Sequence, residues 1–191
     1  IDDARNDAWI LLSMICRMDR TFYYMHMEDE LSAEQYREYE CLISKRAEHV
    51  PLQYITGEQE FMGLPFKVNP AVLIPRQDTE TLVDEALKVV QPGMKIMDMC
   101  TGSGCILISI LKKCPGVEGI GYDISEKALD VAKENAKLNG VFAEFKRSDL
   151  FEAVKGNYDV ILSNPPYIPS EVIPTLINNA LRTTMHTPKP R

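Results

Sequence analysis

The fold is decided by the stretch IMDMCTGSGC, residues 96–105. Its apolar first half predicts a buried strand, and its second half predicts a tight turn that opens a helix over residues 104–113. Gly102 and Gly104 would let the backbone approach a ligand closely, because glycine has no β-carbon. The turn lacks the Gly-x-Gly-x-x-Gly spacing of dinucleotide-binding proteins. A strand-to-helix turn without any ligand therefore stays open as the alternative.

Predicted strands and helices alternate around this stretch. We expect strands over residues 95–99, 119–123, 144–146 and 158–163. We expect helices over residues 104–113 and 125–139, the second with Ser125 as its N-cap. Strands separated by helical segments form a parallel sheet. The pattern therefore predicts an α/β fold with a doubly wound, Rossmann-like sheet.

The N-terminal residues predict a small helical bundle. Apolar residues at helical spacing indicate helices over residues 8–16, 22–25 and 32–46. Ser32 followed by Gln35 is the pattern of a capping box at the start of the third helix. We expect these helices to form a domain over residues 1–50.

A connector is expected between the bundle and the sheet. Residues 54–57 and 61–68 are strand-like, with Gly63 and Pro65 as turn signals, which predicts a β-hairpin connector over residues 51–74. Asp78 is the expected N-cap of a helix over residues 79–90, which Pro92-Gly93 would end. The third domain would cover residues 75–191.

The charge of the chain is uneven. The net charge is −7, and residues 1–60 carry all of the excess, with 13 acidic and 6 basic residues. An acidic surface repels phosphate backbones, which disfavours nucleic acid as a partner of this part. A solvated helix face and a surface for a basic partner both stay open.

Cysteine and histidine usage predicts no metal site and no disulfide framework. The five cysteines include no Cys-x-x-Cys pair, and the three histidines are far apart in the sequence. No apolar run is long enough to span a membrane, and residues 1–3 do not begin a signal peptide. We therefore expect a cytoplasmic protein.

Acidic residues follow three successive predicted strands. Asp98 ends the first, and Asp123 ends the second, where a carboxylate can accept hydrogen bonds from both hydroxyls of a ribose. Asp149 follows the third strand and could accept from the amino group of adenine. Taken singly, Asp123 could be a helix N-cap and Asp149 a solvated loop acid. Together the three acids favour an adenosyl ligand.

Residues 163–167, SNPPY, follow the fourth predicted strand and are the most specific signal. Proline fixes the backbone and removes its N–H donors, so the carbonyls of this loop can only accept hydrogen bonds. The side-chain oxygen of Asn164 adds another acceptor, and Tyr167 could stack on a planar group. Such a loop would hold an NH2 group by its hydrogens and favour a pyramidal nitrogen in methyl transfer. A rigid proline turn without chemistry is the alternative.

These motifs together resemble a known family. The NPPY sequence, the loop over residues 98–104 and Asp123 are similar to class I methyltransferases that act on exocyclic or amide nitrogen. PLQYITG at residues 51–57 and LIPRQDTE at residues 73–80 resemble the release-factor glutamine methyltransferases, also called HemK or PrmC. The similarity runs from Asp7 to about Ile173.

The resemblance implies an activity and a partner. The family uses S-adenosyl-L-methionine, releases S-adenosyl-L-homocysteine, and methylates the side-chain amide nitrogen (N5) of the glutamine in the Gly-Gly-Gln motif of peptide chain release factors. Its N-terminal domain is understood to help recognise that protein.

Residue spacing and the resemblance together give the expected site. The expected cofactor contacts are Asp98, Cys100, Thr101, Gly102, Ser103, Gly104, Asp123, Ile124, Asp149, Leu150 and Asn164. The expected catalytic residues, which would hold the glutamine, are Asn164, Pro165, Pro166 and Tyr167. The family pattern also places Arg76, Thr79 and Glu80 near the site.

Two departures from the family pattern lead to further expectations. Cys100 stands where the family usually has glycine, and its side chain could crowd the methionine end of the cofactor. The sequence ends at Arg191, whereas the family continues with further strands, so we expect the fourth strand at an exposed sheet edge and a loop-like segment over residues 178–191.

Two other functions stay open. One is a nucleic-acid methyltransferase acting on an exocyclic amine, which would use the same NPPY loop. The other is a non-catalytic remnant that binds only a cofactor or a partner.

Overall fold

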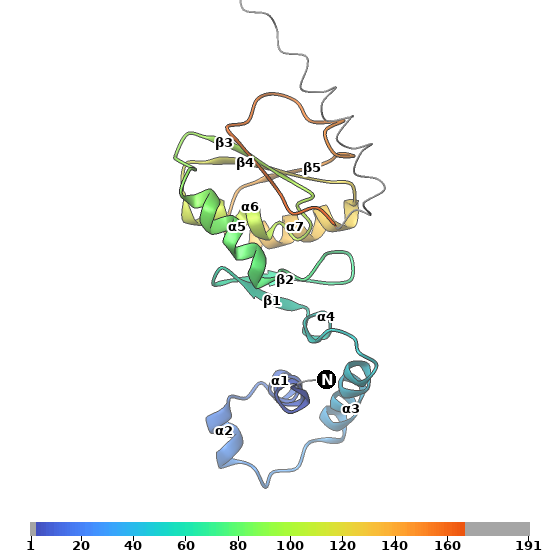
Figure 1. Cartoon of the computed structure of the whole chain (residues 1–191). Helices are drawn as coiled ribbons and strands as arrows, with labels where there is room; N and C mark the ends of the chain where they lie inside the picture. The colour runs from blue at the N-terminus through green and yellow to red at the C-terminus, as the bar shows by residue number, and fades with distance from the viewer. Residues whose placement is uncertain (1–2, 167–191) are drawn as a thin grey trace, which may run out of the picture.

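The computed structural model describes residues 3–166 of the 191-residue chain. In chain order the elements are α1 (Ala4–Cys16), α2 (Arg20–Met25), α3 (Ala33–Ala47), α4 (Leu52–Thr56), β1 (Glu58–Phe61), β2 (Leu64–Lys67), α5 (Gln77–Leu87), β3 (Lys95–Met99), α6 (Cys105–Lys113), β4 (Glu118–Asp123), α7 (Glu126–Leu138), β5 (Glu144–Arg147) and β6 (Val160–Ser163). Figure 1 shows helices α1–α3 at one end, the β1–β2 hairpin in the middle and the larger sheet at the other end.

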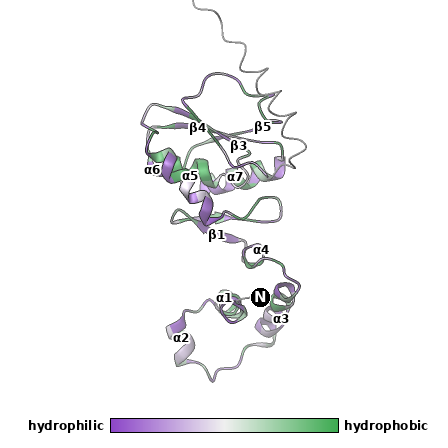
Figure 2. Cartoon of the chain, viewed as in Figure 1, coloured by the Kyte–Doolittle hydropathy of each residue, from purple (hydrophilic) through white to green (hydrophobic). Residues whose placement is uncertain are grey.

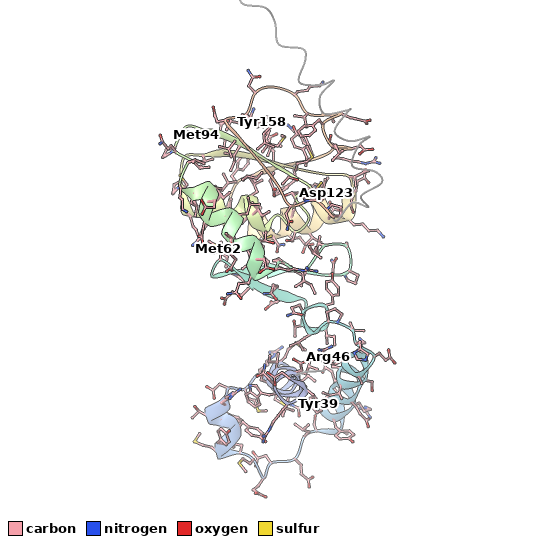
Figure 3. All side chains as sticks on the ribbon, in the orientation of Figure 1. Tyr39, Arg46, Met62, Met94, Asp123 and Tyr158 are labelled. Atoms are coloured by element: carbon pink, nitrogen blue, oxygen red, sulfur yellow. The ribbon has the colours of Figure 1, made fainter. Side chains whose placement is uncertain are left out.

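The N-terminal helices bury few of their residues. Leu11 is the one fully buried residue of α1, and α2 and α3 contain none. Polar contacts join α1 to α3: Arg46 Nε lies 2.7 Å from a carboxylate oxygen of Asp7, and the Tyr39 hydroxyl donates to the Ala8 carbonyl at 3.3 Å. Figure 3 shows Tyr39 and Arg46 in this part, far from Asp123. The predicted helices, including the capping box at the start of α3, are confirmed.

The connector differs from the prediction in its first half. Residues 54–57 were expected as a strand, but residues 52–56 form the short helix α4. Pro51 precedes the helix with φ −53°, which suits a helix start, and Gly57 ends it in the left-handed conformation with its N–H donating to the Gln53 carbonyl. The strand prediction was wrong because β-favouring side chains matter less here than these two flanking residues.

The second half of the connector is a hairpin, as predicted, but its strands are residues 58–61 and 64–67, and its turn lies inside the stretch 61–68 that was expected as one strand. Strands β1 and β2 pair antiparallel, with Phe61 opposite Leu64. Met62 and Gly63 form the turn with φ values of 55° and 76°, and positive φ at both positions is typical of the two-residue turns that match strand twist. Phe61 and Phe66 bury their rings between the hairpin and the helices, 6.1 Å apart and edge to face.

Helix α5 begins earlier than predicted. Arg76, not Asp78, is its N-cap, and the helix runs from Gln77 to Leu87 rather than to residue 90. Asp78 therefore lies inside the first turn, where its negative charge complements the positive end of the helix dipole.

The larger sheet is parallel, with the strand order β5-β4-β3-β6. This confirms the predicted α/β, Rossmann-like fold. Figure 1 shows α5, α6 and α7 between this sheet and the hairpin, and Figure 2 shows that α6 is rich in hydrophobic residues, which are buried from Cys105 to Leu111. Within residues 3–166, β6 pairs on one side only, as expected for an edge strand.

The opposite face of the sheet has no helix on it in the part of the chain that is described. A cluster of buried residues covers this face, and the loop between β5 and β6 packs against it. The cluster consists of Met97, Met99, Ile120 and Tyr122, with Cys100, Val154 and Tyr158 packed against it. The Tyr122 and Tyr158 hydroxyls are 3.0 Å apart, within hydrogen-bond distance.

Asn135 connects three parts of the fold. Its side chain on α7 is fully buried and makes three hydrogen bonds. Its oxygen accepts from the Lys67 N–H at 2.7 Å, and its NH2 group donates to the carbonyls of Lys67 and Ser103 at 3.0 and 2.9 Å. A single side chain thus joins α7 to the hairpin and to the turn after β3.

Candidate functional site

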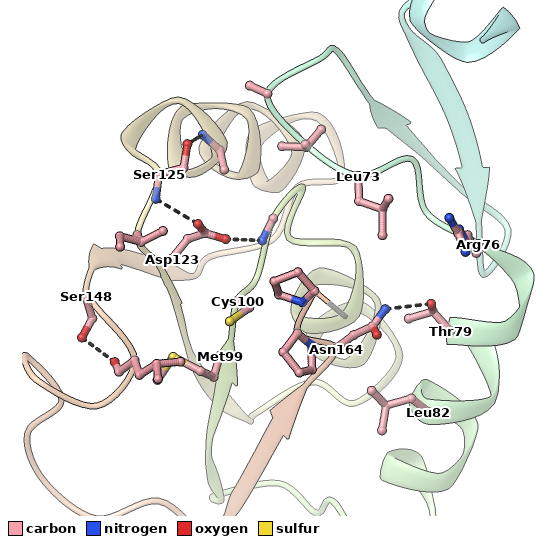
Figure 4. Close-up of a pocket in the computed structure, with 18 of the residues that line it drawn as sticks. Leu73, Arg76, Thr79, Leu82, Met99, Cys100, Asp123, Ser125, Ser148 and Asn164 are labelled. Carbon is pink, nitrogen blue, oxygen red and sulfur yellow. Dashed lines mark hydrogen bonds between the residues drawn. The ribbon is translucent and has the colours of Figure 1, made fainter. Parts of the chain in front are cut away.

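A cavity of about 690 Å³ lies at the carboxyl ends of the parallel strands. Binding crevices of open α/β sheets lie at this edge, and the volume is in the range of small-molecule sites. The lining residues come from the segment before α5, from α5, from the ends of β3–β6 and from the start of α7. They are Ala71, Val72, Leu73, Arg76, Asp78, Thr79, Leu82, Met99, Cys100, Gly102, Asp123, Ile124, Ser125, Ala128, Ser148, Asp149, Leu150, Asn164, Pro165 and Pro166. Figure 4 shows this cavity in close-up.

The turn after β3 depends on glycine at two positions. Gly102 and Gly104 have φ values of 54° and 78°, in the left-handed region that glycine adopts without strain. A β-carbon on Gly104 would lie 2.9 Å from Ile108 Cδ1 and 3.2 Å from Ala132 Cβ. Gly104 therefore allows the start of α6 to pack directly against α7. Gly102 faces open space and lines the cavity.

Asp123 ends β4 and is held between two loops. One carboxylate oxygen accepts from the Gly102 N–H and the other from the Ser125 N–H, both at 2.9 Å (Figure 4). Ser125 is the N-cap of α7, because its hydroxyl accepts from the Ala128 N–H. Asp123 is thus not the helix cap, and each of its oxygens keeps a free lone pair beside the cavity.

Asp98 supports the turn from beneath and does not line the cavity. Its side chain is fully buried and accepts a hydrogen bond of 2.6 Å from the Thr101 hydroxyl. Burial raises the pKa of Asp98 to about 7, because a charged carboxylate is poorly solvated there, and the nearby Asp123 adds to this shift.

Cys100 occupies a position that favours glycine. Its φ is 60°, a left-handed conformation that costs a residue with a β-carbon free energy, and its half-buried side chain lines the cavity. This backbone conformation gives a physical reason for the glycine of the family pattern. Burial and then the carboxylates of Asp123 and Asp98 raise the pKa of the Cys100 thiol. The neutral thiol is therefore favoured.

The loop after β6 brings Asn164 to the same cavity. Ser163 fixes the strand end, because its hydroxyl donates to the Met99 carbonyl at 2.9 Å. The Asn164 NH2 group then donates to the Thr79 hydroxyl on α5 at 3.1 Å (Figure 4). Pro165 and Pro166 continue the lining of the cavity. Tyr167, which was expected in the site, lies outside the described residues.

The loop after β5 contributes Asp149 and Leu150 to the site. Both residues line the cavity, and the Ser148 hydroxyl donates to the Leu150 carbonyl. Leu150 adopts a φ of 45°, so the loop turns sharply after β5. The acid expected to meet the adenine amino group therefore lies at the edge of the cavity that also contains Asp123.

Most of the predicted residues meet at this cavity. Those that line it are Cys100, Gly102, Asp123, Ile124, Asp149, Leu150, Asn164, Pro165 and Pro166. Four others do not line it and shape the turn instead: Asp98, Thr101, Ser103 and Gly104. Of the residues expected nearby, Arg76 and Thr79 line the cavity, while Glu80 accepts from the Met62 N–H at 2.7 Å and holds the hairpin to α5.

Sequence reasoning missed the apolar wall of the cavity. Leu73, Leu82, Met99 and Ala128 contribute to the lining, and so does Ser148. Leu73 belongs to the LIPRQDTE motif, which was quoted without a role for it. Leu82 and Ala128 lie on the inner faces of amphipathic helices and could not be told from core residues. Within residues 3–166 no group of three or more metal-ligating side chains is placed to hold a metal ion, and every helix is too short or too polar to cross a membrane.

Comparison with known families divides the chain into two matches. Residues 1–57 match the PrmC N-terminal domain, and residues 77–185 match the methyltransferase small domain. The second match continues beyond Ile173, so the expected end of the resemblance was too early.

Curated relatives match most of the chain. The chain is 39% identical over 171 residues to a release factor glutamine methyltransferase of Geobacter sulfurreducens, covering 89% of this chain and 60% of that protein. It is 40% identical over 181 residues to one of Moorella thermoacetica, covering 92% of this chain and 64% of that protein. The chain thus spans about three fifths of the length of the relatives that it matches.

Among solved structures, Trm5b from Pyrococcus abyssi is similar with a TM-score of 0.51 and 25% identity, covering 64% of this chain and 37% of that one.

Proposed function

The chain belongs to the release factor glutamine methyltransferase family, and we propose that it transfers a methyl group from S-adenosylmethionine to the side-chain amide nitrogen (N5) of glutamine. The substrate would be the glutamine of the Gly-Gly-Gln motif in a peptide chain release factor. One observation carries this proposal: Asn164 and the Gly102–Asp123 pair, which come from different strands, line one cavity.

The residues present fit S-adenosylmethionine. The carboxylate of Asp123 keeps lone pairs for ribose hydroxyls, and Asp149 offers an acceptor for the adenine amino group. Ile124 and Leu150 would supply apolar contacts to the adenine, and Gly102 and Cys100 would contact the methionine part. When bound there, the cofactor supplies an electrophilic methyl group on a sulfonium centre. Asp98, Thr101, Ser103 and Gly104 would act through the shape of the turn.

The NPP loop would hold the substrate amide. Amide nitrogen is a poor nucleophile, because its lone pair is delocalised into the carbonyl group. The Asn164 side-chain oxygen and the carbonyls of the loop can accept hydrogen bonds from the two N–H groups of the substrate amide. These hydrogen bonds favour a pyramidal nitrogen. Holding that nitrogen in line with the methyl group lowers the entropic cost of reaching the transition state. No general base is needed before transfer, because the nitrogen becomes acidic only as the methyl arrives. Tyr167 remains proposed as the residue that stacks on the planar amide group.

The N-terminal helices are proposed to recognise the release factor. They belong to the segment that matches the PrmC N-terminal domain, and residues 1–60 carry the whole net charge of −7. A complementary basic surface on the partner would increase the association rate at low salt. The proposed division therefore remains a recognition domain over residues 1–50, a connector over residues 51–74 and a methyltransferase domain from residue 75 onward.

A methyl-transfer assay tests the proposal directly. We would incubate this chain with radiolabelled S-adenosylmethionine and a purified bacterial release factor, and locate the added methyl group by peptide mass spectrometry. The expected product carries one methyl group on the glutamine of the Gly-Gly-Gln peptide. A release factor with glutamate in place of that glutamine is the matched negative control.

Parallel incubations decide between the alternatives. Transfer to DNA or RNA but not to the release factor would establish the nucleic-acid activity instead. Binding of S-adenosylmethionine in calorimetry without transfer to either substrate would identify the non-catalytic remnant.

A further inference from the structure

We propose that Thr79 is a positioning residue that turns the side-chain amide of Asn164, so that the amide oxygen faces the cavity. This inference rests on the proposed function, because it assigns to the Asn164 oxygen the task of accepting from the substrate NH2 group. Thr79 itself would not touch the reacting atoms.

The contact joins two distant parts of the chain. The Asn164 Nδ2 atom lies 3.1 Å from Thr79 Oγ1, although the residues are 85 positions apart in the sequence. Figure 4 shows the bond crossing from the loop after β6 to the first turn of α5. It is the one side-chain hydrogen bond recorded for Asn164 among residues 3–166.

A carboxamide needs such a partner to be useful as an acceptor. Its oxygen and its NH2 group are similar in size, and the terminal torsion of asparagine is broad, so rotation exchanges the two groups at little cost. Only the oxygen can accept from a substrate NH2 group; the NH2 end would repel it. When the Thr79 hydroxyl accepts from Nδ2, the oxygen is left for the cavity.

Helix α5 gives the hydroxyl a fixed position. The Thr79 N–H donates to the Arg76 carbonyl at 3.0 Å, which closes the first helical turn. The next residue, Glu80, accepts from the Met62 N–H, and Val83 and Ala86 of the same helix are buried. The hydroxyl is therefore held by the packed hairpin and helix, and not by the exposed loop that contains Asn164.

Replacement of Thr79 by valine removes the hydroxyl and keeps the shape of the side chain. We expect Thr79→Val to lower kcat for methyl transfer to the release factor by about tenfold, the size of one lost orienting hydrogen bond. The dissociation constant of S-adenosylmethionine, measured by calorimetry, should stay within about twofold. Thr79→Ser, which keeps the hydroxyl, should restore the rate.

Thr81→Val is the matched control. Thr81 lies on the same helix, is exposed and does not line the cavity, so its replacement should leave both the rate and the melting temperature unchanged. A wild-type rate in Thr79→Val overturns the proposal. So does an equal loss in Thr79→Val and Thr79→Ser together with a lower melting temperature.

A second measurement separates this inference from the proposed function. The side-chain NH2 signals of Asn164 can be assigned in a 15N-labelled sample by their absence from Asn164→Ala. The hydrogen bond predicts that these protons exchange more slowly with water in the wild type and in Thr79→Ser than in Thr79→Val. If the wild type methylates no release factor, the proposed function fails. Equal exchange in all three proteins would show that Thr79 does not orient Asn164, whatever the activity.

Discussion

At the scale of single residues, the site depends on which atoms three side chains present to the cavity. Asn164 offers an oxygen or an NH2 group, depending on one torsion. Asp123 accepts two backbone N–H groups and keeps lone pairs for a ligand. Cys100 adopts a left-handed backbone conformation that favours glycine, which has no β-carbon. Each of these properties can be tested with one substitution.

Asn164→Ala removes the acceptor proposed for the substrate amide. We expect methyl transfer to the release factor to fall to background, while the dissociation constant of S-adenosylmethionine changes by less than about tenfold, or 1.4 kcal/mol. The reason is that Asp123 and Gly102, which are proposed to hold the cofactor, are unchanged in this variant and still line the cavity. Single-turnover kinetics and calorimetry measure the two quantities. Retained transfer in this variant would contradict the proposed role of the loop.

Cys100→Gly should make the cofactor turn easier to form. Glycine adopts a φ of 60° without the steric cost that cysteine bears, which is about 1 kcal/mol, and it also removes a side chain from the cavity. We expect S-adenosylmethionine to bind about threefold to tenfold more tightly to this variant in calorimetry. Cys100→Ala is the control, because it removes the thiol and keeps the β-carbon. If the alanine variant gains as much as the glycine variant, the thiol and not the backbone conformation limits binding.

At the scale of elements, the site is built where four strand ends meet the first turns of two helices. Helix α5 contributes Thr79 and is held to the hairpin by Glu80. Helix α7 is held to the hairpin and to the turn after β3 by Asn135. The hairpin therefore supports the cavity from a distance, although it contributes no residue of β1 or β2 to the lining.

Asn135→Ala tests this coupling between elements. The change leaves the Lys67 N–H and two carbonyls without their partner, and we expect a loss of about 2 to 4 kcal/mol in the free energy of unfolding. Urea denaturation measures this loss. Asn157→Ala, a change in an exposed loop, is the control and should lie within about 0.5 kcal/mol of the wild type. A wild-type stability for Asn135→Ala would show that the buried amide does not couple the three segments.

At the scale of the whole molecule, the stability of the fold depends on the protonation of the Asp98 carboxyl in the centre of the sheet. Asp98 lies on the central strand β3 with its side chain fully buried, and burial raises its pKa to about 7 from the usual value of 3.8. The folded state thus binds a proton that the unfolded state has already lost between these two pH values. Stability contributed by the protonated carboxyl is present at low pH and is lost as the pH rises toward 7.

This linkage predicts a pH dependence that one substitution removes. The wild type should lose stability between about pH 5 and about pH 7, with a slope of at most about 1.4 kcal/mol per pH unit from this group. Asp98→Asn cannot titrate there, and its uncharged oxygen can still accept from the Thr101 hydroxyl. We expect its stability, relative to the wild type, to increase over the same interval in urea denaturation. Parallel pH profiles of the two proteins would contradict the raised pKa.

The sequence predicted the elements that depend on local patterns. The capping box at Ser32, the helix start at Ser125 and the four parallel strands lie where composition and spacing placed them. The strand predicted at residues 54–57 was wrong, and the cap predicted at Asp78 was displaced to Arg76. For α4, Pro51 and Gly57 outweighed the strand preference of the residues between them, because they fix the backbone at its two ends. Helix α5 already begins at Gln77, so Asp78 lies inside its first turn and cannot be its N-cap.

By itself, therefore, the sequence determined which residues stand at the ends of strands, because parallel strands bring their carboxyl ends to one edge of a sheet. Only the tertiary structure decided which of them reach the cavity. Asp98 and Asp123 end adjacent strands, yet alternation along β3 buries the first beneath the turn, while the second ends at the cavity. The Thr79–Asn164 contact and the three bonds of Asn135 depend on helix packing, and packing joins residues that no local pattern relates.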